Sequence, residues 1–171
     1  SYITDPAYPY WLIYRNKSFD SVANKMTFDI FKVYRDRLIT KAITKPNGKF
    51  RVLKSRNIGN NEIVNIDGYD SYVDDINSLD VSKFLNQENC VLVPNLTYNP
   101  RACMLPTGCI ADGSVAILTL KNTNTKVSTE DLAFYATSQF NEFYAIARNR
   151  GTRSLNIDNN SVFFFGKLKH A

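Results

Sequence analysis

Apolar residues in this chain form short runs, and a turn signal ends each run. The run at 50–53 follows the turn residues at 45–48, and the run at 90–93 stops at Pro94. Runs bounded in this way by Pro, Gly and Asn are typical of β-strands, and we expect strands at 28–33, 50–53, 63–66, 90–93, 114–120 and 161–165. No run approaches the roughly 20 apolar residues that cross a bilayer, so the sequence predicts no membrane-spanning helix and no membrane partner.

Two stretches have helical rather than strand periodicity. Residues 128–131 have the form of a capping box, and apolar residues follow at helical spacing as far as Ala147. Gly151 stands where such a helix would end, so one long helix is predicted over 128–151. A shorter amphipathic helix is predicted over 18–26 with Ser18 as its N-cap, and a helical turn over 81–85.

Together these elements predict an α+β fold. We expect one domain over 1–171, with a twisted, mixed β-sheet of short strands, one long helix and one or two shorter helices. A chain of 171 residues is long enough for one domain with a sizeable core. The chain begins at Ser1 without a methionine and without the pattern of a signal peptide, so we expect a cytoplasmic piece of a longer protein.

Cysteine and histidine content limits the chemistry. The three cysteines are Cys90, Cys103 and Cys109, and the single histidine is His170. An odd cysteine count without a Cys-x-x-Cys pair predicts neither a disulfide framework nor a zinc site, and the cysteines are expected in the core. No nucleophile has a histidine base nearby in the sequence, and no Gly-rich phosphate loop is present. We therefore expect no catalytic residue and no metal site, and we interpret the carboxylate pairs at 74–75 and 130–131 as loop and capping residues.

Charge is distributed unevenly along the chain. Residues 1–60 contain 12 Lys or Arg against 4 Asp or Glu, a net charge of +8. Residues 61–90 contain 1 against 7, a net charge of −6, and residues 91–171 contain 8 against 5, a net charge of +3. A basic segment of this size suits a polyanionic partner, although an uneven solvated surface would have the same composition.

Basic and amide side chains gather in stretches that we expect to be loops or ends of elements. Arginine pairs with guanine or phosphate, asparagine pairs with adenine, and a groove is reached most easily from such positions. The candidate DNA-contacting residues are Arg35, Arg37, Lys41, Lys54, Arg56, Asn57, Asn99, Arg101, Arg148, Arg150 and Arg153. We expect the base readers in two stretches, namely Arg148, Arg150 and Arg153 after the long helix, and Lys54 and Arg56 on the turn after the strand at 50–53. Arg148 follows the long helix directly and can instead cap its last carbonyl groups.

Six stretches, taken in order, resemble a known family. They are YWLIYR at 10–15, RDRLIT at 35–40, VLKSRNI at 52–58, VPNL at 93–96, DGSVAIL at 112–118 and FYAIARN at 143–149. The set resembles the region downstream of the catalytic domain in N6-adenine DNA methyltransferases of bacterial restriction–modification systems of type II. Similar domains form the specificity subunits of type I systems.

The resemblance implies that the chain is a target recognition domain, which selects the double-stranded DNA sequence to be methylated. It also implies two things about the parent enzyme: S-adenosylmethionine is its cofactor, and a catalytic domain of the same chain is a partner of this domain. The family's [NDS]-P-P-[YF] motif is absent, because no two of the six prolines are adjacent, and residues 5–8 (DPAY) are only a near match. We therefore expect DNA recognition without catalysis and without a cofactor in this fragment. Alternatives are a stand-alone protein- or RNA-binding module and, less in keeping with the residues, a nuclease.

Overall fold

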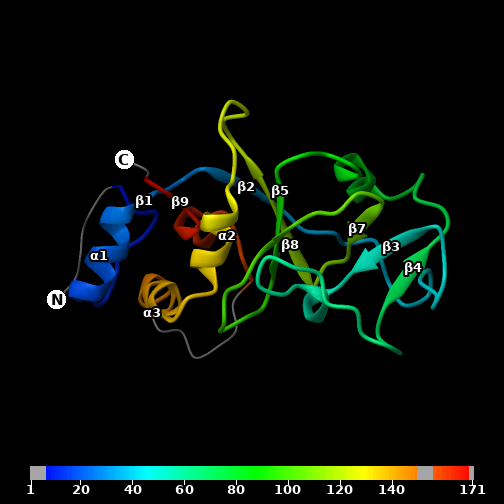
Figure 1. The fold of residues 1–171 in the computed structure, drawn as a ribbon, viewed down its shortest axis with the longest axis horizontal. Coiled ribbons are helices and arrows are strands. Elements are labelled where there is room, and N and C mark those ends of the chain that lie inside the picture. Colours follow the sequence, from blue (N-terminus) through cyan, green and yellow to red (C-terminus); the bar gives the residue numbers. More distant parts are fainter. Residues whose placement is uncertain (1–6, 150–155, 170–171) are drawn as a thin grey trace.

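A four-stranded antiparallel sheet separates a helical layer from a second, smaller sheet (Figure 1). The computed structural model describes residues 7–149 and 156–169, and it confirms the α+β class predicted from the sequence. The strands of the central sheet, in spatial order, are β2 (Phe31–Tyr34), β8 (Val115–Leu120), β5 (Cys90–Pro94) and β6 (Cys103–Met104). The strands are thus divided among several sheets, where the sequence analysis expected one.

Both faces of the central sheet are covered, because every residue of β5 is buried. Val91 and Val93 belong to the apolar cluster that contains the helices. Cys90 and Leu92, which point to the other face, belong to the cluster of the smaller sheet. This explains why the run at 90–93 shows no alternation between apolar and polar residues.

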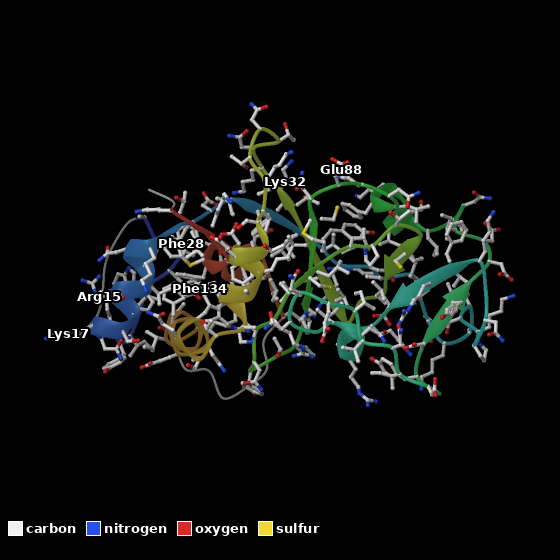
Figure 2. The ribbon with its side chains drawn as sticks, viewed as in Figure 1. Arg15, Lys17, Phe28, Lys32, Glu88 and Phe134 are labelled. Atoms are coloured by element: carbon white, nitrogen blue, oxygen red, sulfur yellow. The ribbon has the colours of Figure 1, made fainter. Side chains whose placement is uncertain are left out.

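The helical layer contains α1 (Lys17–Lys25), α2 (Thr129–Tyr135), α3 (Ser138–Ala147), the 3-10 helix η3 (Ser161–Phe164) and the strand pair β1 (Met26–Thr27) with β9 (Lys167–Leu168). Aromatic rings fill the space between these elements. Phe19 of α1 stacks on Phe143 of α3 with ring centroids 4.7 Å apart. Phe28, labelled in Figure 2, stacks on Phe143 and Phe163. Aromatic contacts of this kind stabilise a core beyond the area that they bury.

The smaller sheet has the order β4 (Ser71–Val73), β3 (Phe50–Leu53), β7 (Cys109–Ala111). β3 is antiparallel to β4 and parallel to β7. In the sequence, the 3-10 helix η1 (Ser55–Asn57) follows β3, and the 3-10 helix η2 (Asp80–Phe84) follows β4. The helix η2 confirms the helical turn expected near 81–85. The short η1 follows β3 directly and begins the loop region in which the candidate site lies.

The helix predicted over 128–151 is in fact two helices. Its predicted start is confirmed, since Ser128 and Asp131 form the reciprocal hydrogen bonds of a capping box. The break follows from Thr137, whose hydroxyl donates to the Phe134 carbonyl at 2.7 Å and accepts from the Phe140 amide at 3.1 Å. A threonine side chain that bonds to backbone in this way starts a new helix rather than continuing the old one. Similarly, α1 begins after Asn16, which caps the Phe19 amide, and not after Ser18.

Several strand predictions are wrong for local reasons. Residues 161–165 form η3 rather than a strand, because the Asp158 carboxylate accepts the amides of Asn160 and Ser161 and turns the chain. The expected strand at 63–66 is a loop with one bridge between Ile58 and Ile63. The strands β4 and β6, which were not predicted, are only three and two residues long.

All three cysteines are buried, as expected for core residues. Among the residues that the structure describes, no helix has the length and apolar character needed to cross a membrane.

Candidate nucleic-acid interface

Arg101 joins two segments that the sequence analysis treated as separate clusters. Its Nε donates to the Ile58 carbonyl at 2.6 Å and its Nη2 donates to the Ser55 carbonyl at 3.4 Å. Burial lowers the pKa of this guanidinium from its usual value. Since both acceptors flank Arg56, the loop 95–101 and η1 form one connected surface.

Asn57 lies inside this surface rather than on it. It is fully buried, its Oδ1 accepts the Lys54 amide at 3.0 Å, and its Nδ2 donates to the Val64 carbonyl at 2.9 Å and to Asp70 Oδ1 at 2.7 Å. The expectation that Asn57 contacts DNA therefore does not agree with its placement. Its side chain holds the shape of the turn that carries Lys54 and Arg56.

Lys54 and Arg56 both lie against the ring of Tyr69. Lys54 Nζ is 3.9 Å and Arg56 Cζ is 4.8 Å from the ring centroid. The Arg56 amide also donates to the Tyr69 hydroxyl at 3.2 Å. Such contacts between a cation and an aromatic ring restrict long side chains without neutralising them. Within residues 7–149 and 156–169, neither cation forms an ion pair with a carboxylate.

A hollow of about 610 Å³ lies next to this aromatic ring. Lys41, Lys45 and Lys54 contribute to its wall, together with Tyr69 and Asp70. The fold thus brings together two of the expected residues, Lys41 and Lys54, from segments on either side of β3. Lys45, which forms an ion pair with Asp74, was not among the expected residues. Its position in the turn before β3 was the one sequence clue to it.

Arg35 and Arg37 follow β2 and do not contribute to the wall of the hollow. Asp36 between them is buried, and its Oδ2 accepts the amides of Leu38 and Ile39 at 3.1 and 2.7 Å. The chain therefore turns sharply after β2. Arg35 is half-buried and Arg37 is exposed.

The loop 95–101 also contacts the helical layer. Asn141 of α3 donates its side-chain amide to Asn99 Oδ1 at 3.0 Å. Arg148 is the C-cap residue of the same helix, is half-buried, and lies with its Cζ 5.3 Å from the centroid of the Tyr144 ring. Arg148 thus lies at the end of α3, with its guanidinium beside an aromatic ring. Arg150 and Arg153 lie outside the described residues.

Two exposed apolar side chains on this loop were not among the candidate residues predicted from the sequence. Leu96 is 52% exposed and Tyr98 is 60% exposed, and both lie between Pro94 and Pro100. By contrast, the basic residues Arg15 and Lys17 lie at the far end of the molecule, at the start of α1 (Figure 2). The candidate interface consists of the loop 95–101, η1 and the hollow.

The side chains of this surface are suited to binding a polyanion. In the part of the chain that the structure describes, no three His, Cys, Asp or Glu side chains are grouped as metal ligands. The lysines and arginines offer hydrogen-bond donors and positive charge, which suit phosphate oxygens and base edges. No protein-family model matches this chain, and no curated protein matches it.

Proposed function

We propose that this chain recognises a specific sequence in double-stranded DNA, as the specificity domain of an adenine-N6 DNA methyltransferase in a restriction–modification system. The observation that carries the DNA-binding part of the proposal is the convergence of Lys41, Lys54 and Arg56 beside one hollow. The family assignment rests on the resemblance of the six sequence stretches.

The contacts favour different roles for the different basic residues. Lys41 and Lys54 line an open hollow, and they would bind phosphates as point charges. Arg56 is exposed and held over Tyr69, so its guanidinium is the best placed to pair with a base edge. Arg101 is occupied by backbone carbonyls, and its role would be to position Asn99 and Arg56.

Methylation would be carried out by a catalytic domain in the same parent chain, with S-adenosylmethionine bound there. This fragment would hold the duplex while the parent enzyme flips the adenine out of the helix. The proposal places no catalytic step on the residues of this chain.

A binding assay with single variants tests the proposal. Fluorescence anisotropy with a labelled duplex pool should give log affinities that fall linearly with log salt, by about 0.9 for each phosphate contact. Lys54→Gln and Arg56→Gln should each weaken binding, and Lys54→Gln should also reduce the salt slope. Lys17→Gln removes the same charge at the far end of the molecule and serves as the matched control.

Three results would contradict the proposal. They are a salt slope near zero, equal losses for Lys54→Gln and Lys17→Gln, and tighter binding of single-stranded RNA than of duplex DNA. The last of these would favour the alternative of an RNA-binding module.

Specificity is tested in the full-length parent enzyme, by sequencing the sites that it methylates. Arg56→Ala, Arg150→Ala and Arg153→Ala are introduced one at a time. A residue that reads a base should relax the methylated motif at one position, with a cost of about 1–3 kcal/mol on the specific site. If all three variants leave the motif unchanged, the base-reading role moves to the loop with Asn99.

A further inference from the structure

The loop 95–101 presents two apolar side chains on a backbone that is held at both ends. Leu96 and Tyr98 are each more than half exposed. At the start of the loop, the buried Asn95 donates its amide to the Ser114 carbonyl at 2.9 Å and accepts the Ile157 amide on its Oδ1 at 3.0 Å. At its end, Pro100 is buried and Arg101 is fixed to η1.

The interior of the loop is fixed as well. Thr97 Oγ1 accepts the Asn99 amide at 3.0 Å, and Arg101 Nη1 donates to the Asn99 carbonyl at 3.3 Å. Asn141 holds Asn99 from the side of α3. A loop restrained in this way presents Leu96 and Tyr98 at fixed positions, with more than half of each side chain exposed. Apolar side chains displayed on a rigid loop mark a contact surface.

The surroundings of the two side chains indicate the chemistry of that partner. Neither the loop 95–101 nor η1 contains an acidic residue, whereas Arg101 and Arg56 are both cationic. A partner that covers this surface has to offer a flat apolar group flanked by negative charges. A base-pair step between two phosphates has this combination.

We propose that Leu96 and Tyr98 form a wedge that enters a base-pair step of the bound duplex and partly unstacks it. This inference rests on the proposed function, since it presupposes duplex binding. Tyr98 would stack on a base that the opening exposes, and Leu96 would fill the gap next to it. Arg56 would contact DNA beside the opened step, and Arg101 would keep the wedge in shape.

The wedge has a consequence that phosphate binding alone does not have. Inserting apolar side chains between base pairs opens one step and kinks the duplex there. The adenine analogue 2-aminopurine fluoresces more strongly when it is unstacked. A duplex is first enriched, by repeated binding to the 171-residue chain, from a pool with a randomised centre. This duplex is then prepared with 2-aminopurine at each position in turn.

We expect the unchanged protein to raise the fluorescence at one step of this duplex. Tyr98→Ala and Leu96→Ala should remove the rise and weaken binding by about fivefold or more, which is the lower end of what loss of one stacking side chain costs. Tyr98→Phe should retain both effects. Ile13→Ala, which removes a similarly exposed apolar side chain in the N-terminal segment, should change neither.

The outcomes separate the wedge from the proposed function. If the duplex binds with the predicted salt slope but the fluorescence and affinity of Leu96→Ala and Tyr98→Ala match the unchanged protein, the wedge is wrong and duplex recognition stands. If no duplex is enriched or bound, the proposed function fails and the wedge fails with it. If the two residues instead support binding to vesicles of anionic phospholipid and leave the duplex signals unchanged, the loop contacts a membrane and the wedge is again wrong.

Discussion

The side chain of Asn149 holds the backbone of Trp11, although 138 residues separate them in the sequence. Asn149 Nδ2 donates to the Trp11 carbonyl at 3.1 Å, and its Oδ1 accepts the Ile13 amide at 2.9 Å. Leu12, between the two bonded peptides, is fully buried. Asn149 also has a φ of 56°, a left-handed conformation that ends α3. One residue therefore ends a helix and fixes the N-terminal segment.

Replacing Asn149 separates these two roles. Asn149→Gly keeps the left-handed conformation and removes both side-chain bonds, and we expect a loss of about 1 kcal/mol in the free energy of unfolding. Asn149→Ala should lose about 1 kcal/mol more, because a Cβ is strained at this φ. Trp11 is the only tryptophan, so its fluorescence anisotropy reports the N-terminal segment directly and should fall in both variants.

The control for this experiment is Asn61→Gly. Asn61 also has a positive φ, of 56°, and an exposed side chain. The Asn61→Gly variant should have the same Trp11 anisotropy and the same free energy of unfolding as the unchanged protein. An Asn149→Gly protein with unchanged Trp11 anisotropy would show that other contacts hold the segment.

A second prediction concerns the buried amide of Asn57. Asn57→Ala removes three hydrogen bonds and leaves the Val64 carbonyl and one Asp70 oxygen without this donor. We expect the free energy of unfolding, measured by urea denaturation, to fall by about 2 kcal/mol or more. Asn60→Ala, at an exposed position three residues away, should change it by less than about 0.5 kcal/mol. A similar small effect for both variants would contradict the role assigned to Asn57.

Local patterns predicted the parts of the fold that local forces determine. The strands at 50–53 and 90–93 and the start of α2 at Ser128 agree with the structure. These segments carry their own signals, namely an apolar run between turns or a capping box. The break between α2 and α3 was not predicted, because a threonine at position 137 is compatible with a helical pattern. Only the hydrogen bonds of its hydroxyl to the backbone interrupt the helix.

Parts of the fold that depend on distant partners were not predictable. β7 is three residues long and owes its strand conformation to parallel pairing with β3, more than 50 residues earlier in the chain. The candidate site has the same limitation. Composition indicated Lys54 and Arg56 as donors, but the ring of Tyr69 beneath them and the burial of Asn57 depend on how the loops pack.

Burial should protect the cysteine thiols from reagents. Desolvation raises the pKa of Cys90 to about 11 and that of Cys103 to about 12, and it raises the pKa of Cys109 as well. The reactive thiolate is therefore scarce at pH 8 in the folded protein. We expect slow reaction with a disulfide reagent in native buffer, and rapid reaction of all three thiols in guanidinium chloride. One thiol that reacts rapidly in native buffer would contradict this prediction.

Stability at acid pH should depend on Asp131, whose side chain is fully buried. Its carboxylate accepts the amides of Ser128 and Leu168 at 2.9 and 2.8 Å and the Lys167 ammonium at 2.9 Å. Burial by itself would raise the pKa of Asp131, but the bonds to Lys167 and to the backbone outweigh it, so the pKa is lowered from its usual value of 3.8. These bonds join α2 to β9.

A carboxyl group with a lowered pKa in the folded protein stabilises the fold at pH values above its unfolded pKa. Asp131→Asn should therefore reduce the free energy of unfolding at pH 7, by about 3 kcal/mol, because it also leaves the Lys167 ammonium without its partner. As the pH falls below 3.8, the unchanged protein loses this stabilisation and the difference between the two proteins should narrow. Urea denaturation between pH 2.5 and 7 measures this difference, with Asp67→Asn as the control at an exposed position. A difference that stays constant over this range would show that the charge of Asp131 is not the source of the stabilisation.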